Sequence, residues 1–224
     1  MTFLNLKTML AQDVNRSDKE MWYPVWINRA LRKIQTDASF ACMKSRQDVV
    51  IPAGSSSVLL PTRFKELYPE QFPVAVISPP GSGGIVSEIP CEVTSREDIV
   101  GYRISSLLPV RQASFSGSLV GYPVWTELTG SGWTLNIADP ASETLTFRVA
   151  HHAFLPELAA DSDSNYLTLN YPDLVENKVK GIAFMAVNDP IGAQFEAMAT
   201  KLLNEAVLDD KRRASRGRVM RMGG

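Results

Sequence analysis

The chain has 224 residues, of which 45% are hydrophobic and 21% charged, so it can bury a sizeable core in one large or two small domains. Its formal net charge is −1, but the positive charge is unevenly placed. Residues 211–224 contain six Lys and Arg and no acidic residue, which leaves residues 1–210 with 17 basic against 24 acidic side chains, about −7. Nucleic-acid-binding domains spread cations over a whole face. This composition argues against such a domain in the body of the chain.

No stretch approaches the roughly 20 consecutive apolar residues that a membrane helix needs. The N-terminus carries Lys7 within a short amphipathic pattern rather than an unbroken apolar signal core. We therefore expect a soluble protein with no membrane partner and no cleaved signal. Cys42 and Cys91 lie in unrelated contexts without a C-x-x-C pair, so we expect reduced thiols rather than a disulfide or a zinc site.

The N-terminal region predicts two helices. We expect a short helix over residues 3–13 and an amphipathic helix in WYPVWINRALRKIQ, residues 22–35. Apolar side chains recur there with helical spacing, and polar ones take the other side. The buried stripe is expected to contain Tyr23, Ile27, Ala30, Leu31 and Ile34. Ser17 or Asp18 is expected to cap this helix, and Pro24 fits its first turn.

Two further helices are predicted near the other end of the chain. In YPDLVENKVKGIAFMAVND the first helix begins at Pro172, and Asp189 with Pro190 ends it and begins the next. Its apolar positions are Val175, Val179, Ile182, Ala183 and Ala186. The last helix, about 190–210, is expected to bury Phe195, Met198, Ala199, Leu202, Leu203 and Ala206. Residues 211–224 are then expected to form an extended basic tail.

Between these ends, residues 46 to about 155 predict β-structure. The clearest strand is ETLTFRV, in which Leu145, Phe147 and Val149 alternate with polar residues. Other predicted strands are DVVI, SVLLP, VAVIS, IVSEIPCEV, LVGYPVWTEL and GWTLNIA, separated by Gly, Pro and Ser clusters. Successive strands without intervening helices favour an antiparallel sandwich or barrel.

The order of elements predicts an α+β fold in which the helical domain is discontinuous. Residues 1–45 and 165–210 are expected to form one helical bundle. The β-domain, residues 46–164, is expected to be inserted as a single excursion, and residues 211–224 follow as the tail.

The Gly-rich run PPGSGGIVSEI, residues 79–89, shares only its glycines with phosphate-binding loops. Those loops end in a Lys and a hydroxyl residue that open a helix, whereas a β-type run follows here. We therefore interpret the run as a hairpin loop.

The segment DSDSNYL places Asp161, Asp163 and Asn165 at the spacing that begins a calcium-binding loop. Tyr166 stands where that loop needs Gly, and Pro172 stands where it needs a bidentate Glu. Because the motif fails at both positions, we interpret the segment as a solvated acidic connector between the β-domain and the helices.

The two histidines of the chain, His151 and His152, are adjacent at the end of a predicted strand, so their side chains should point to opposite faces. No H-E-x-x-H motif, no G-x-S-x-G motif and no arranged Cys–His pair is present. We therefore predict no catalytic residue, no metal and no cofactor. The tryptophans are expected to be core or interface anchors: Trp22, Trp26, Trp125 and Trp133.

Several segments together resemble the head-to-tail adaptor proteins of tailed bacteriophages. They are VWINRALRKIQ, LLPTRFKEL, the W-x-L-x-I-x-x-P pattern from Trp133, the T-L-x-F pattern that follows, and YPDLVENKVKGIAFMAVND with the last helix. The long β-region is similar to the type that carries an inserted β-domain, as in short-tailed phages. The resemblance covers most of the chain.

The resemblance implies a non-enzymatic virion protein that forms a homo-oligomeric ring, usually of twelve copies. Such a ring connects the capsid portal to the tail and helps to retain the packaged genome. The implied partners are the portal protein, a downstream tail or nozzle protein and the double-stranded DNA that passes through the channel. The implied location is the head-to-tail interface of the virion, with assembly in the host cytoplasm.

The resemblance also implies a role for the basic tail, which in such adaptors docks against the portal. Arginines can pair with carboxylates, and Val and Met can supply adaptable apolar contact. The expected portal-binding residues are Arg212, Arg213, Arg216, Arg218, Val219, Met220, Arg221 and Met222. Trp26, Arg29 and Arg32, placed on the polar edge of the long helix, are expected to contact neighbouring subunits.

Three alternatives remain at this point. The tail is alternatively a disordered solubilising end. The protein is alternatively a β-sandwich recognition module of another virion or tail component. It is alternatively a DNA-contacting protein that acts through its basic tail, which predicts an affinity for DNA that falls steeply with salt.

Overall fold

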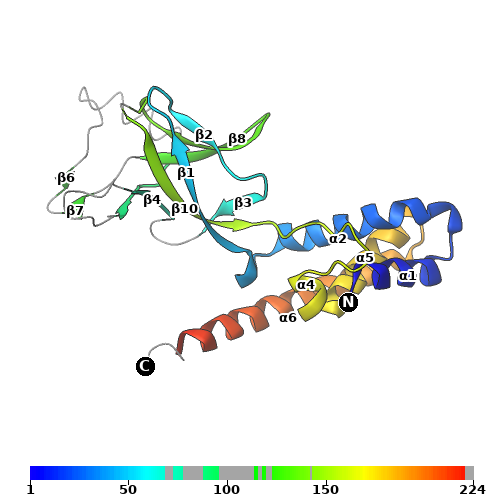
Figure 1. Cartoon of the computed structure of the whole chain (residues 1–224). Coiled ribbons are helices and arrows are strands. Elements are labelled where there is room, and N and C mark those ends of the chain that lie inside the picture. Colours follow the sequence, from blue (N-terminus) through cyan, green and yellow to red (C-terminus); the bar gives the residue numbers. More distant parts are fainter. Residues whose placement is uncertain are drawn as a thin grey trace. The chain divides into compact units, whose positions relative to one another are not determined.

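The computed structural model describes residues 1–68, 73–77, 88–95, 114–115, 118–119, 123–141 and 143–219. The chain forms two compact units (Figure 1). One unit, Met1–Met43 with Phe154–Gly224, is helical, and the other, Lys44–Ala153, contains the strands. The predicted α+β class, with antiparallel sheets inserted between terminal helices, is confirmed.

The helical unit is built from both ends of the chain. Its elements are α1 (Phe3–Val14), the 3₁₀-helices η1 (Ser17–Trp22) and η2 (Ala41–Met43), α2 (Tyr23–Asp37), α4 (Tyr166–Asn170), α5 (Pro172–Ala186) and α6 (Ile191–Val219). Their apolar faces form one core, which includes Phe3, Leu6, Leu10, Ile27, Ile34, Leu167, Val175 and Val179. The core therefore joins sequence segments that the whole β-region separates.

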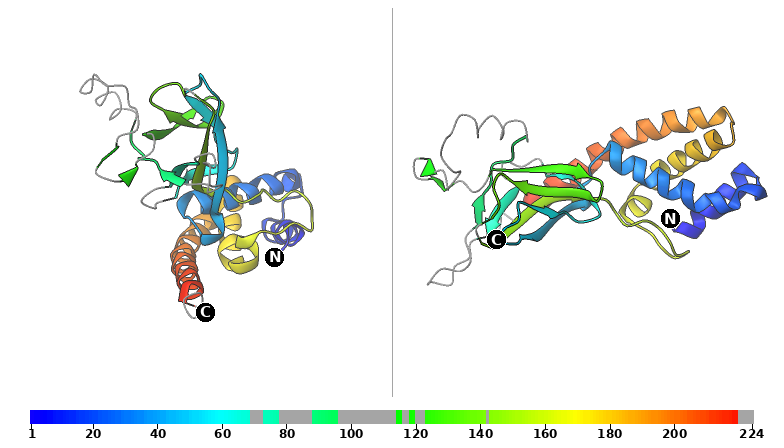
Figure 2. Two further views of the ribbon diagram at one scale, coloured as in Figure 1. Left: turned by 60° about the vertical axis from the view of Figure 1, so that its left-hand side comes forward. Right: turned by 90° about the horizontal axis from the view of Figure 1, so that it is seen from above.

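The predicted apolar stripe of α2 is confirmed, because all five of its members are buried. Pro24 lies in the first turn, as predicted. The predicted cap is wrong: neither Ser17 nor Asp18 caps α2, because both belong to η1, which runs directly into α2. In the right-hand view of Figure 2, α2 runs between α6 on one side and the connector after the β-unit on the other.

Helix α5 begins at the predicted Pro172 and buries Val175, Val179 and Ala183. Ala186, predicted to belong to the apolar stripe, is exposed because the helix ends at this residue. Helices α5 and α6 contact each other through the stacked rings of Phe184 and Phe195, whose centroids lie 5.5 Å apart.

Helix α6 runs beyond its predicted end at residue 210, as far as Val219. Ala199 and Ala206 are buried, as predicted, whereas Met198 lies at the edge of the packed face and stays 50% exposed. The prediction ended the helix where the apolar repeat ends. However, Lys, Arg and Ala are strong helix formers that need no burial, and no Pro interrupts the segment.

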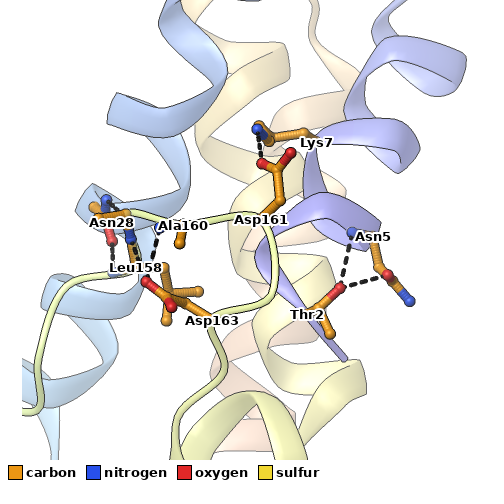
Figure 3. Close-up of polar contacts among 9 residues, drawn as sticks. Thr2, Asn5, Lys7, Asn28, Leu158, Ala160, Asp161 and Asp163 are labelled. Carbon is orange, nitrogen blue, oxygen red and sulfur yellow. Dashed lines mark hydrogen bonds and ion pairs between the residues drawn. The ribbon is translucent and has the colours of Figure 1, made fainter.

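The connector, residues 154–165, packs on the helices, whereas the sequence-based bounds placed all of it except residue 165 in the β-domain. The Asn28 side chain donates to the Leu158 carbonyl oxygen and accepts the Leu158 N–H, both at 2.9 Å (Figure 3). Leu158 is buried in the helical core. The Asn28 side chain of α2 therefore satisfies both backbone hydrogen-bonding groups of Leu158, as the backbone of a neighbouring β-strand does.

The β-unit contains two larger antiparallel sheets. Its strands are β1 (Lys44–Ile51), β2 (Ser57–Leu59), β3 (Phe64–Leu67), β4 (Val74–Ile77), β5 (Glu88–Pro90), β6 (Ser114–Phe115), β7 (Ser118–Leu119), β8 (Val124–Thr129), β9 (Gly132–Ile137) and β10 (Leu145–Ala153). One sheet has the order β1-β10-β4-β5, with β3 also paired to β10, and the other has the order β2-β9-β8. Strands β6 and β7 pair with each other.

Residues from both larger sheets form one hydrophobic core in the β-unit. The predicted alternation in β10 is confirmed, because Leu145, Phe147 and Val149 are all buried. They share the core with Leu135 and Ile137 of β9. The predicted strands IVSEIPCEV and LVGYPVWTEL, and the Gly-rich run before β5, lie partly outside the described residues.

The packing of α5 against α6 depends on Gly192. A Cβ at this position would lie 2.8 Å from the Met185 backbone nitrogen and 3.0 Å from the Gly181 carbonyl oxygen. We expect Gly192→Ala to lower the free energy of unfolding of the helical unit by about 1–3 kcal/mol, because the overpacked backbones must move apart. Urea unfolding followed by far-UV circular dichroism measures this change.

Gly130→Ala is the matched control, because nothing lies within 4 Å of a Cβ added there. Its stability should stay close to that of the wild type. Equal stabilities for both variants would contradict the close approach of α5 and α6.

Candidate functional site

The basic end of α6 is a preformed helix rather than the extended tail that we predicted. Residues 211–219 continue α6 without interruption. The side chains of Lys211 and Arg212 are exposed and make no hydrogen bond or ion pair among the described residues. The side chains of Arg216, Arg218 and Val219, and all of residues 220–224 with Met220, Arg221 and Met222, lie outside the described part of the chain. Their predicted contacts with a partner stay predictions.

Asp210, directly before residues 211–219, anchors this part of α6 to the rest of the helical unit. Its side chain is only 5% exposed and accepts the Ala41 N–H at 2.6 Å and the Tyr166 hydroxyl at 3.0 Å. Burial and the hydrogen bond to Asp210 raise the pKa of Tyr166 above its ordinary value, so that the phenol stays a donor. The carboxylate therefore ties α6 to both η2 and α4.

Arg213, one of the predicted portal-binding arginines, makes its contacts within the subunit. Its Nε lies 2.7 Å from an oxygen of Asp209, one helical turn away. Its guanidinium also donates to Asn170 at 3.2 Å and lies 5.8 Å from the centre of the Tyr171 ring. Arg213 therefore helps to fix α6 on α4 and α5, whereas its neighbour Arg212 points a charge into solvent.

The residues predicted to contact neighbouring subunits lie on two different parts of α2. Trp26 is a core residue rather than an edge residue: it is 7% exposed, and its ring centroid lies 5.7 Å from that of Tyr23. The helical phase explains this, since Trp26 adjoins the buried Ile27 and Ala30. The exposed apolar residues near this end of the helix are Met21, Trp22 and Val25. Of these, Trp22 was expected from the sequence to be a core or interface anchor, and Met21 and Val25 were not singled out.

Arg29 and Arg32 line an open groove of about 580 Å³ between α2, α5 and α6. Helix α2 supplies one wall. Helix α5 supplies apolar side chains, of which Met185 is 45% exposed. At the α6 side, Glu196 forms an ion pair with Lys178 of α5. The groove is thus an amphipathic surface, apolar at its centre and positively charged along α2.

The histidines do not form a joint site. The His151 ring packs on Phe64 at 5.4 Å between centroids, while His152 Nδ1 lies 3.2 Å from a carboxylate oxygen of Glu66 and its ring contacts Tyr68. Burial lowers the pKa of both imidazoles. Both side chains serve packing in the β-unit.

The acidic residues of the connector are used in its folding. Asp163 accepts the N–H groups of Ala159 and Ala160 at 2.9 and 2.8 Å, and these hydrogen bonds lower the pKa of its carboxyl (Figure 3). Asp161 forms an ion pair with Lys7 of α1. In the described residues, no group of three or more His, Cys, Asp and Glu side chains lies close enough to hold a metal ion. Cys42 and Cys91 are free thiols.

None of the described helices combines the length and apolar character that crossing a membrane requires. A family model described as SU10 adaptor protein matches residues 1–222, which is almost the whole chain. The chain belongs to the SU10 adaptor protein family. No curated protein matches the sequence.

Membership in the SU10 adaptor protein family makes this chain a phage adaptor protein, a structural component of the virion at the connection of head and tail. The family is one of structural proteins, and the surfaces described above are suited to binding other proteins. The basic end of α6 and the groove on the helical unit are the candidate functional surfaces.

Asp210→Ala tests how the basic end is held. The substitution leaves the Ala41 N–H and the Tyr166 hydroxyl without their acceptor, so we expect a loss of about 1–3 kcal/mol in the stability of the helical unit. Amide hydrogen exchange in residues 207–219 should become faster. The matched control is Asp209→Ala, which removes an exposed ion pair with Arg213 and a long hydrogen bond of 3.4 Å from the Tyr171 hydroxyl, and should cost less than about 1 kcal/mol. Equal effects of both substitutions would contradict the anchoring role of Asp210.

Proposed function

We propose that this adaptor forms a homo-oligomeric ring, a dodecamer, that joins the capsid portal to the downstream tail or nozzle protein. The ring lies at the head-to-tail interface of the virion and assembles in the host cytoplasm. Packaged double-stranded DNA passes through its channel, and the ring helps to retain it. Membership in the SU10 adaptor protein family supports this role.

The observation that carries the proposal is the basic end of α6. Asp210 and Arg213 fix the helix to the rest of the unit, and the residues that follow carry cations without acidic neighbours. Guanidinium groups bind carboxylates in bidentate geometry, which suits docking on an acidic partner surface. A weak contact at each subunit becomes strong when a ring repeats it, because the later contacts form at high effective concentration. We assign the portal as the partner of this end.

The charge of the remaining chain fits a channel for DNA. Residues 1–210 carry about −7, so a lumen lined by this part of the chain would not bind phosphates tightly. The groove residues Arg29 and Arg32 are assigned to contacts between subunits.

Truncation after Ser215 tests the role of the basic end. The variant keeps Asp210 and Arg213, so we expect it to fold and to assemble with itself like the wild type. It should lose binding to the portal ring of its own phage, measured by co-sedimentation. Full binding by the truncated chain would contradict the proposed portal contact.

The variant Arg216→Gln, Arg218→Gln and Arg221→Gln is the companion to the truncation. It removes the charge and keeps the length, so loss of binding in this variant assigns the contact to the arginines. If the wild type instead binds DNA with a steep salt dependence and ignores the portal, the tail is a DNA contact.

A further inference from the structure

The groove on the helical unit is a local concentration of positive charge in an otherwise acidic chain. Arg29, Arg32 and Lys33 line its α2 wall. Lys33 is paired with Asp37 at 2.9 Å, and the Arg32 guanidinium lies over the Phe154 ring. The acidic residue of the groove, Glu196, is already paired with Lys178. Arg29 is exposed and has no polar partner in the part of the chain that the structure describes. The groove therefore suits an acidic occupant.

The groove also offers apolar contact at its centre. Ile182 and Met185 of α5 line it, and Met185 is 45% exposed. Methionine adapts its shape to a neighbour at little cost. An occupant with small side chains beside its acidic group could approach these residues closely.

The connector of the same chain has these properties. Residues 155–164 contain Glu157, Asp161 and Asp163 and no Lys or Arg. Asp161 pairs with Lys7 and Asp163 accepts backbone N–H groups of the connector, which leaves Glu157 as the carboxylate for a partner. Glu157 is exposed and has no polar partner among the described residues, and the small side chains of Ala159 and Ala160 are exposed beside it.

The connector is held in one conformation although it contains no helix or strand. Asn28 pairs with the backbone of Leu158, and Asp163 accepts the two backbone N–H groups of Ala159 and Ala160 (Figure 3). A surface loop that is already ordered loses little conformational entropy when it binds.

The groove and the connector lie on different sides of α2. The groove wall is formed by Arg29, Lys33 and Thr36, whereas the connector bonds to Asn28 and Gln35. The right-hand view of Figure 2 shows α2 between α6 and the connector. Arg32 lies between the two surfaces, over the ring of Phe154 at the start of the connector. Asn28 and Gln35 hold the connector on its own flank of α2, and among the described residues neither Arg29 nor Glu157 has a polar partner in its own copy, so both are free to pair between copies.

We propose that the acidic connector of one copy docks in the basic groove of the next copy. The inference rests on the proposed ring function and names the surfaces that form it. The contact is head-to-tail, so every copy uses its groove for one neighbour and its connector for the other, and repetition closes a ring when the rotation between copies divides a full turn. The carboxylate of Glu157 meets the guanidinium of Arg29, and Ala159 and Ala160 pack on Met185.

A charge exchange tests this pairing. Arg29→Glu and Glu157→Arg each place like charges in the interface, and both residues are exposed, so the fold should be unaffected. Each single variant should form rings on the portal of its own phage with a yield reduced by about tenfold or more. The double variant restores opposite charges in reversed order and should recover ring formation to within about threefold of the wild type. Ring yield is counted by negative-stain electron microscopy.

Glu205→Arg is the control, because it reverses an exposed charge on α6 that lies in neither surface. This variant should form rings like the wild type. Rings that tolerate both single variants, or single defects that the double variant does not repair, would overturn the connector–groove contact while leaving the ring function in place. Absence of rings from the wild type would overturn the proposed function itself.

Discussion

The burial of one apolar core by the two ends of the chain is the constraint on which the rest of the structure depends. Helices α1 and α2 cannot cover their apolar faces without α5 and α6. The chain must therefore leave the helical unit after Met43, form the β-unit, and return to the helical unit at Phe154. Asp210 closes this arrangement, because its carboxylate binds η2 from the first half of the chain and α4 from the second. The C-terminal helix is thus fixed where its basic end begins.

This constraint places both candidate surfaces on the helical unit. The groove exists because α2 and α6 flank α5 without covering it, and the connector is ordered because α2 offers Asn28 and Gln35 to its backbone. The basic end of α6 extends a helix that is already anchored. A phage adaptor protein interacts with other components of the head and tail, and a unit that presents several separate surfaces suits that task.

The sequence predicted what depends on periodicity. The stripe of α2, the positions Val175, Val179 and Ala183 of α5 and the alternation in β10 follow from burial on one face, and the structure confirms them. The sequence-based prediction failed where helix propensity or tertiary packing, rather than periodicity, determines the structure. Helix α6 continues past residue 210 because its residues favour helix without burial. Trp26, predicted to lie on the polar edge of α2, is buried and packs beside Tyr23. The connector and the groove depend on tertiary contacts, such as Asn28 with Leu158, that no local pattern encodes.

The central claim is that copies of this adaptor close into a ring on the portal. The most direct measurement is cryo-electron microscopy of the purified chain mixed with the portal ring of its own phage. The account predicts a closed ring stacked on the portal, with density for the basic end of α6 reaching into the portal. Single subunits that do not associate with the portal would contradict it.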